Sequence, residues 1–332
     1  MGELLRQGKK VMHATGSSAF TNTLRKIVGV RARNLFKFFN SFITTETNSF
    51  DVLICDEAHR IRESSVNRYT PKEQKTDLPQ VDELLRIAKL NIFFLDEYQI
   101  VRPSEVGNIL MLKKAAKRFG VDDKNIIEFE LKTQFRCSGS DAYLQWLDNI
   151  LDIRDTEMKE FDTKMEFRIF DNPSKMMLEI RNRNKEKLNS ARIVAGFCWP
   201  WSNPKEDGLL VDDVQIGDFK MPWEKKDQFW KWATDNSGME QVGTVYTSQG
   251  FEFDYIAVIF GNDLVFNQIK NKWIAVPEKS YDTQIKRNNS HLLKHLQHVY
   301  RVLMSRAHKG VYVYFMDKST ENYFRNHLPK IN

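Results

Sequence analysis

Two adjacent carboxylates follow an apolar run early in the chain. Asp56 and Glu57 come directly after the run 52–55, a pattern that predicts a buried strand ending in two acids. In a parallel α/β sheet, ligands bind outside the carboxyl ends of the strands. Mg²⁺ prefers carboxylate, water and phosphate oxygens, and attack on a γ-phosphate requires an oriented water. The D-E-A-H stretch 56–59 therefore fits phosphoryl transfer, although a strand followed by an acidic helix start would contain the same residues.

A second acidic strand end follows one strand later. The run 91–95 predicts a strand, and Asp96, Glu97 and Gln99 come directly after it. A glutamine in this place can bond both an attacking water and a phosphate oxygen, so Gln99 is a candidate sensor of the γ-phosphate. A polar turn after a strand is the alternative interpretation.

Three arginines are candidates for binding phosphate. Arg136 follows Gln134 and Phe135 where two units of the chain join, and it could reach across a cleft or be structural. Arg301 and Arg306 lie five residues apart on a predicted helix, 290–308. An added guanidinium at a phosphoryl-transfer site raises the rate by roughly 10³–10⁵. Arg306 is the candidate for that role, while a surface ion pair is the alternative for Arg301.

A hydroxyl-rich turn occupies residues 244–252. A predicted strand, 242–246, breaks into this turn and returns through an acidic pair to another strand. Such a turn can offer backbone N–H groups and hydroxyls to the phosphates of a nucleotide or a nucleic acid. A plain hairpin turn is the alternative.

Composition favours two ordinary α/β domains. The chain has 332 residues, of which 41% are apolar and 28% are charged. Lysine and arginine total 50 against 44 acids, and the net charge of +6 permits a polyanionic partner. The three cysteines are far apart and show no metal spacing, which predicts a reducing, cytoplasmic location. No apolar run is long enough to span a membrane, and the start does not resemble a signal peptide.

Strand-like runs alternate with helical stretches along the whole chain, which indicates the α/β class. In the first half, the pattern predicts a helix over 31–42, a helix over 81–89, a helix capped by Ser104 and a strand over 125–131. Residues 266–289 are rich in asparagine and lysine and are interpreted as a surface insertion. His13 is interpreted as structural.

Taken together and in order, these motifs resemble those of superfamily-one helicases. The order is D-E-A-H, D-x-x-Q, F-R, T-S-Q-G-F-E and S-R-A, which corresponds to motifs II to VI over nearly the whole chain. The chain looks most like the bacterial Schlafen-like DNA/RNA helicase-domain family, and four segments carry this closer resemblance: residues 55–62, 133–137, 195–201 and 302–307. The resemblance implies two RecA-like P-loop NTPase domains with parallel sheets, residues 1–137 and 138–332. It also implies nucleic-acid-dependent ATP hydrolysis coupled to translocation.

The resemblance implies a role for each candidate. Asp56 would hold Mg²⁺, Glu57 would be the catalytic base, Gln99 the γ-phosphate sensor, and Arg136 and Arg306 the finger arginines. Four residues of the turn would couple the nucleotide state to the grip on single-stranded DNA or RNA: Thr244 and Gln249 on the nucleic-acid side, Gly250 and Glu252 on the ATP side. Tyr246 departs from the histidine expected in this family.

Nucleic-acid contacts are also expected outside this turn. Arg31 and Arg33 lie just after the first strand, where such helicases contact the backbone of the nucleic acid, although a solvated helix face is equally consistent. Trp199 and Trp201 could stack on bases, with core packing as the favoured alternative.

The larger departure is that G-x-x-x-x-G-K-[ST] does not occur in these residues, and Gly8-Lys9-Lys10 is not a phosphate loop. The resemblance makes residues 1–6 the tail of the phosphate-loop helix, so the first domain is expected to be N-terminally truncated. We therefore expect weak binding of ATP and Mg²⁺, and the site would depend on a missing N-terminal segment or a partner domain. The alternative is a non-catalytic nucleic-acid-binding or scaffold module that kept the fold. Another P-loop class, such as a GTPase, is disfavoured because it has no second RecA-like domain.

Overall fold

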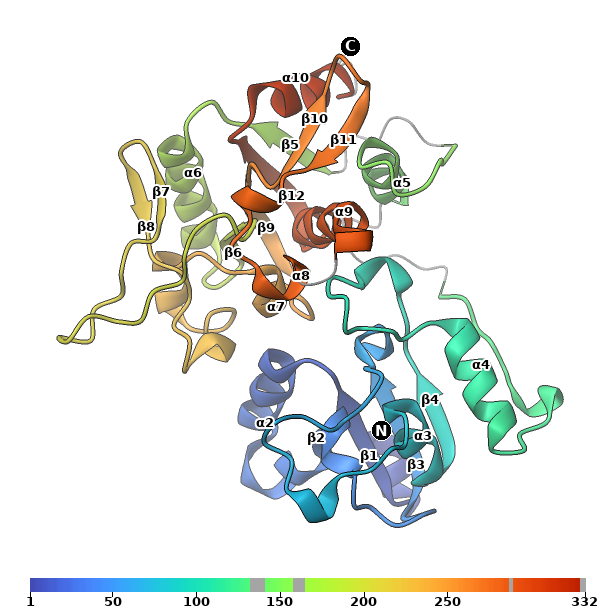
Figure 1. Ribbon diagram of the computed structural model, residues 1–332. Coiled ribbons are helices and arrows are strands. Elements are labelled where there is room, and N and C mark those ends of the chain that lie inside the picture. The colour runs from blue at the N-terminus through green and yellow to red at the C-terminus, as the bar shows by residue number, and fades with distance from the viewer. Residues whose placement is uncertain (132–140, 158–164, 287–288, 329–332) are drawn as a thin grey trace. The chain divides into compact units, whose positions relative to one another are not determined.

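The chain folds as two compact units, Met1–Glu130 and Leu131–Asn332. A computed structural model describes residues 1–131, 141–157, 165–286 and 289–328 (Figure 1). The expected domain boundary at residue 137 and the candidate Arg136 lie outside the described residues. Each unit is built on its own parallel sheet, as expected for the α/β class.

The first unit contains a four-stranded parallel sheet with the order β2-β1-β3-β4. Its strands are β1 (Val11–Thr15), β2 (Phe36–Phe38), β3 (Phe50–Asp56) and β4 (Ala88–Phe93). Its helices are α1 (Gly2–Arg6), α2 (Ser18–Ala32), α3 (Gln80–Arg86) and α4 (Ile109–Arg118). Leu53 and Cys55 of β3 share a core with Leu84 of α3 and Ala115 of α4, so these two helices cover one face of the sheet.

The register of this sheet determines which side chains meet. Thr15 of β1 pairs with Asp56 of β3, and Cys55 pairs with Phe93 of β4. The carboxyl ends of three strands therefore share one edge of the sheet, which is where the two acidic stretches follow β3 and β4.

The predicted helix over 31–42 is wrong. Helix α2 continues to Ala32 across a break at Gly29, whose φ is 74°, and β2 then pairs in parallel with β1. Arg25 of α2 donates from Nε and Nη2 to the Phe36 carbonyl at 2.9 and 2.7 Å. The apolar residues at helical spacing are thus used on an edge strand, because pairing with β1 and this arginine satisfy the backbone there.

Two other predictions in the first unit are wrong at their boundaries. The N-cap of α4 is Asn108, whose side chain accepts a bond from the Met111 N–H, and not Ser104. The helix predicted over 81–89 ends at Arg86, because Ala88 already begins β4 beside Phe50 of β3.

The predicted strand over 125–131 is not a strand. Its alternating residues Ile127, Phe129 and Leu131 are 70%, 85% and 79% exposed. Alternation of this kind predicts a strand only if a neighbouring edge is available, and among the described residues none pairs with this segment.

The second unit contains a parallel sheet with the order β5-β12-β9-β6. Its strands are β5 (Glu166–Ile169), β6 (Ala191–Ala195), β9 (Phe253–Phe260) and β12 (Ala307–Phe315), with the hairpins β7 (Val214–Ile216)–β8 (Phe219–Met221) and β10 (Leu264–Asn267)–β11 (Lys272–Ala275). Its helices are α5 (Asp141–Ile150), α6 (Pro173–Glu186), α7 (Val245–Ser248), α8 (Thr283–Lys286), α9 (Leu292–Met304) and α10 (Lys318–Asn326).

Helices cover both faces of this second sheet. Ile180 of α6 packs with Ile259 of β9 on one face. On the other face, Phe260 stacks on Tyr300 of α9 with ring centroids 3.7 Å apart. The apolar runs 193–195 of β6 and 256–260 of β9 reflect this burial on two faces.

Three predictions in the second unit are corrected. The predicted strand over 242–246 is a pair of isolated bridges at Val242 and Gly243 followed by α7. The predicted helix over 290–308 ends at Met304, and β12 begins at Ala307. The stretch 266–289, interpreted as a surface insertion, contains β11 and buries Trp273 against Phe260.

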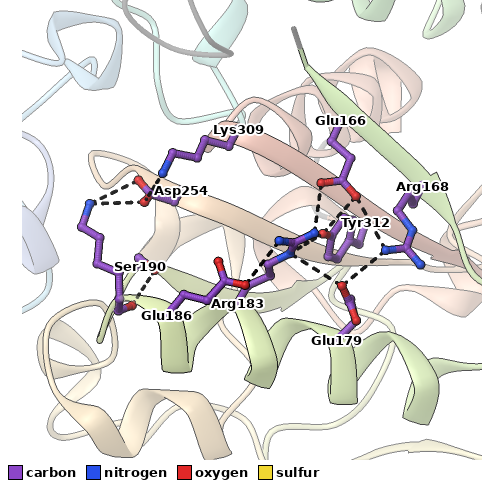
Figure 2. Close-up of polar contacts among 10 residues, drawn as sticks. Glu166, Arg168, Glu179, Arg183, Glu186, Ser190, Asp254, Lys309 and Tyr312 are labelled. Carbon is purple, nitrogen blue, oxygen red and sulfur yellow. Dashed lines mark hydrogen bonds and ion pairs between the residues drawn. The ribbon is translucent and has the colours of Figure 1, made fainter. Parts of the chain in front are cut away.

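A polar network joins α6 to β5 and β12 of the second sheet (Figure 2). Arg183 donates from Nε to the Tyr312 hydroxyl at 3.0 Å, and that hydroxyl donates to Glu166 at 3.2 Å. Burial raises the pKa of Tyr312 to about 12, so the hydroxyl stays protonated. Asp254 accepts from Lys309 at 3.0 Å and from Lys187 at 3.3 Å, which joins β9 to β12 and to the loop after α6. We interpret this network as structural.

Candidate functional site

The acidic turn after β3 has a strained backbone. Glu57 has a φ of 54°, which is the left-handed region that a glutamate rarely adopts. Its N–H donates to Oδ1 of Asp56 at 2.9 Å, and a 3₁₀ turn, Ala58–Arg60, follows. A left-handed residue that is not glycine costs about 1–2 kcal/mol and is common where function needs a fixed side chain.

Both carboxylates of this turn have a histidine nearby. Nε2 of His13, on β1, lies 3.7 Å from Oδ2 of Asp56, and Nε2 of the buried His59 lies 3.1 Å from Oε2 of Glu57. The side chain of Asp56 is 31% exposed and that of Glu57 is 12% exposed. Asp56 thus presents a partly solvated carboxylate, the kind of ligand that Mg²⁺ takes together with phosphate oxygens and water. His13 lies beside Asp56 because of the register of β1 and β3. The sequence alone did not indicate this register.

The end of β4 is joined directly to this turn. The Ala58 N–H donates to the Phe94 carbonyl at 2.8 Å. Beyond Phe94, the amide nitrogen of the buried Gln99 donates to Oδ2 of Asp96 at 2.9 Å. The structure therefore brings Asp56, Glu57 and Gln99 to one edge of one sheet.

Close packing holds the turn from its other side. A Cβ added at Gly107 would lie 2.0 Å from the Ala58 carbonyl oxygen, so the loop before α4 can approach only with glycine there. Nε of the buried Arg60 lies 3.3 Å from Oε1 of Glu105, which is also buried. Burial lowers the pKa of Arg60, and the charge of Glu105 opposes this. Sequence reasoning missed both residues, because their pairing joins segments about 45 positions apart.

The turn of the second unit is buried. Thr244 is the N-cap residue of α7, Gln249 follows the helix, and both are almost completely inaccessible to solvent. Gly250 has a φ of 96°, and this turn conformation is the physical reason for glycine at this position. Oε2 of Glu252 lies 3.1 Å from Nε2 of His308 on β12. The structure brings these candidates together around one short helix.

A glutamate that sequence reasoning missed holds this turn. Oε1 of Glu224 accepts bonds from the Thr244 N–H at 3.2 Å, from the Thr244 hydroxyl at 2.9 Å and from the Thr247 hydroxyl at 2.6 Å. Burial raises the pKa of Glu224 to about 7, and the two threonine bonds oppose this rise. A single acid after Pro-Trp carries no local signal of such a role.

The two arginines of the S-R-A region are buried. Arg306 donates from Nε to the Val302 carbonyl at 3.1 Å and from Nη2 to the Ser305 hydroxyl at 3.2 Å. Arg301 forms a buried ion pair with Asp148 of α5, so the surface pair considered for it is wrong.

The remaining nucleic-acid candidates separate into exposed and structural groups. Arg31 and Arg33 are exposed at the end of α2, beside the exposed apolar residue Val30. The indole N–H groups of Trp199 and Trp201 donate to the Gln215 and Glu224 carbonyls at 3.1 Å. Both tryptophans pack on the core of the second unit, which supports the core interpretation.

Residues 2–317 match the family described as Schlafen group 3, DNA/RNA helicase domain. The chain belongs to this family. The predicted resemblance is therefore confirmed, and the chain has a helicase-like core. The family and the two parallel sheets together confirm the prediction of two RecA-like α/β domains.

Relatives of this Schlafen group 3 domain include an uncharacterized protein of Saccharomyces cerevisiae. The two are 25% identical over an alignment of 302 positions, which covers 80% of this chain and 63% of the yeast protein. Among solved structures, the helicase of PRRSV has a TM-score of 0.40 at 11% identity and covers 97% of this chain. The helicase nonstructural protein 10 of an arterivirus has a TM-score of 0.39 at 9% identity, with the same coverage. The chain spans 51% and 57% of those two viral chains.

The described residues of this Schlafen group 3 domain contain neither a membrane-spanning helix nor a cluster of metal-ligating side chains. None of its described helices is long and apolar enough to cross a membrane. Its described histidine, cysteine, aspartate and glutamate side chains form no group of three or more that could hold a metal ion.

Proposed function

We propose that this chain is the nucleic-acid-binding, ATP-hydrolysing core of a helicase-like protein. One observation carries the proposal: a strained turn presents Asp56 and Glu57 at the carboxyl end of β3, with Gln99 at the end of the neighbouring strand. This is the edge of a parallel sheet at which ligands bind, and its donors are those that phosphoryl transfer requires.

Each side chain would have one task. Asp56 would hold Mg²⁺, which when bound neutralises charge on the phosphates of ATP. Glu57 would take a proton from the attacking water, and the left-handed backbone fixes the direction of its carboxylate. Gln99 would orient that water, once its amide exchanges Asp96 for the ligand. We also propose that ATP is contacted by two arginines, Arg136 and Arg306. Gly250 and Glu252 would contact it from the turn.

We further propose that these 332 residues by themselves bind Mg²⁺-ATP weakly. In phosphate-loop enzymes, backbone N–H groups and a lysine of G-x-x-x-x-G-K-[ST] supply much of the phosphate contact. The 332 residues contain no such stretch.

The second candidate function is a non-catalytic nucleic-acid-binding or scaffold module that kept the fold. The observation that favours it is that G-x-x-x-x-G-K-[ST] does not occur in the 332 residues. Activity measurements decide between the two functions.

Single-stranded DNA or RNA is the proposed partner. The exposed Arg31 and Arg33 would contact phosphates, and Thr244 and Gln249 would shape the second contact. The free thiols of Cys55 and Cys198 support the proposal of a reducing, cytoplasmic location.

Calorimetry and phosphate release with Mg²⁺-ATP test the catalytic half. We expect weak ATP binding, and slow hydrolysis that a single strand stimulates and that Glu57→Gln removes. Glu73→Gln is the matched control, since Glu73 is an exposed glutamate of the same unit. Hydrolysis that survives Glu57→Gln would contradict the role of Glu57, and no hydrolysis at any ATP concentration would favour the scaffold function.

Fluorescence anisotropy with a labelled single strand tests the other half. Binding through phosphates should weaken linearly with salt on logarithmic axes, with micromolar affinity at low salt. The double reversal Arg31→Glu and Arg33→Glu should weaken binding at least about tenfold, because two phosphate contacts become repulsive. The matched control reverses Lys175 and Lys185, which are exposed on α6. Equal losses from both reversals would point to non-specific attraction and against a site on α2.

A further inference from the structure

Glu224 belongs to a segment far from the candidate catalytic residues in sequence. Residues 197–242, here called the aromatic insertion, connect β6 to α7 and contain Trp199, Trp201 and Trp223. The backbone of Glu224 is fixed on both sides within it. Its N–H donates to the Val242 carbonyl at 3.0 Å, and its carbonyl accepts the Trp201 indole N–H at 3.1 Å.

The side chain of Glu224 leaves the aromatic insertion and enters the turn. Its Oε1 accepts the backbone N–H and the hydroxyl of Thr244 and the hydroxyl of Thr247. Thr244 is the N-cap residue of α7, but its side chain makes no capping bond to its own helix. A threonine N-cap ordinarily accepts a bond from the second or third N–H of its helix. Here the Thr244 hydroxyl instead donates to a carboxylate 20 residues earlier in the chain.

We propose that Glu224 is a positioning residue: its carboxylate, delivered by the aromatic insertion, sets the conformation of the turn Thr244–Gly250. That this turn grips nucleic acid rests on the proposed function, whereas the positioning itself does not. The aromatic insertion thereby fixes the conformation of a turn with which it shares no sheet.

The second oxygen of Glu224 favours protonation of this carboxylate. Oε2 is buried, and among the described residues it has no hydrogen-bond partner. A buried carboxylate with one unpartnered oxygen favours its neutral form. The pKa of about 7 places the change between the two forms within the physiological range.

No charged neighbour competes for this proton among the described side chains that bond Glu224. From α7 and its N-cap residue it meets the hydroxyls of Thr247 and Thr244. The flanking Lys225 lies 3.7 Å from Asp227, and Lys226 donates to the Trp201 carbonyl. On another side of α7, Asp282 accepts a bond from Tyr246 rather than from the threonines.

Protonation should therefore control how often the turn opens. If opening exposes Glu224 to water, its pKa falls from about 7 to its ordinary value of 4.5. The open form then becomes about tenfold more populated for each pH unit between about 5 and 7, and levels off above 7.

Hydrogen exchange of the ligand-free chain tests this directly. Mass spectrometry of peptides that cover residues 242–251 should show protection falling about tenfold per pH unit from about pH 5 to 7, after correction for intrinsic rates. Glu224→Gln should keep the acceptor, remove the charge and abolish this slope. Glu240→Gln is the matched control, because Glu240 pairs on the surface with Arg181. It should keep the slope.

Protection that is independent of pH in the unchanged protein, or a slope that survives Glu224→Gln, would overturn the proposal. If Glu224→Gln does not fold, Glu224→Asp is the second variant. Its shorter side chain withdraws from the two threonines, so protection of the turn should fall at every pH, and unchanged protection contradicts the positioning.

Binding of a labelled single strand is measured in parallel on the same variants. Absence of binding in the unchanged protein would remove the proposed function and leave the exchange result standing. Binding that weakens several-fold in Glu224→Asp but not in Glu240→Gln links the positioning to the grip. Equal binding in both, with a changed exchange pattern, would overturn that link.

Discussion

The two turns that carry the candidate residues are built in opposite ways. After β3, a strained backbone projects Asp56 and Glu57, and both carboxylates stay partly accessible. Around α7, Thr244 and Gln249 are buried, and the left-handed position is a glycine, Gly250. The first turn has backbone strain at a charged residue. The second turn has glycine at its left-handed position, and its polar groups are buried.

The source of support also differs. Close backbone packing holds the first turn, with Gly107 against Ala58. A single carboxylate, Glu224, holds the second. The contact of Gly107 with Ala58 does not respond to pH, whereas the buried carboxylate of Glu224, whose pKa is raised, does. The comparison predicts a rigid first turn and an adjustable second turn.

The positions of the tryptophans allow the unfolding of the two units to be measured separately. All seven tryptophans have numbers above 131 and so belong to the second unit. Tryptophan fluorescence in urea therefore reports the second unit. Amide exchange of peptides from β3 and β4 reports the first.

The largest expected effect is that of Gly107→Ala. The new Cβ would meet the Ala58 carbonyl oxygen at 2.0 Å, so the backbone must move. We expect the first unit to lose about 3 kcal/mol of stability, measured by amide exchange in β3 and β4. Gly2→Ala is the control, since a Cβ there meets nothing within 4 Å. A loss as small as the control's would show that packing does not hold the turn.

Glu224→Gln should make the second unit more stable above pH 7. In the folded state the pKa of Glu224 is raised from 4.5 to about 7, so stability falls as the pH rises between these values. Removing the charge recovers about 3 kcal/mol, and the unpartnered amide costs about 1 kcal/mol. Urea denaturation followed by tryptophan fluorescence should show a net gain of about 2 kcal/mol at pH 8. A loss at pH 8 would mean that the carboxylate is stabilising when charged.

Gly250→Ala should destabilise the second unit by roughly 1–2 kcal/mol, because its φ of 96° disfavours an L side chain. Gly208→Ala, at a φ of 81° in a loop with no neighbour within 4 Å, isolates the backbone part of this cost. Denaturation of both variants separates strain from contact. If Gly250→Ala costs nothing, the second turn does not depend on a left-handed residue.

The smallest effect is expected at Glu57. Glu57→Gly relieves a left-handed conformation, so the first unit should gain up to about 1 kcal/mol while it loses the candidate base. Glu73→Gly, at an exposed residue of a 3₁₀ turn, should lose a few tenths of a kcal/mol. Amide exchange measures both changes. Destabilisation by Glu57→Gly would show that the side-chain contacts of Glu57 outweigh its backbone strain.

Much of the fold is predictable because its signals are local. The runs before Asp56 and Asp96 are apolar because these strands carry side chains into the core of a parallel sheet. Helix boundaries were less predictable. The end of α9 at Met304, for example, depends on pairing of Ala307 with Phe253 of a distant strand.

The sequence by itself determined the α/β class, the two strands that are followed by acidic residues, and the family. Each of these depends on residue types within a few positions of one another. Only the tertiary structure decided that Glu224 holds Thr244, that Gly107 admits the loop against Ala58, and that Arg306 is buried. These contacts join segments far apart in the chain. They follow from packing and from satisfying buried polar groups in three dimensions, which leave no periodic pattern in the sequence.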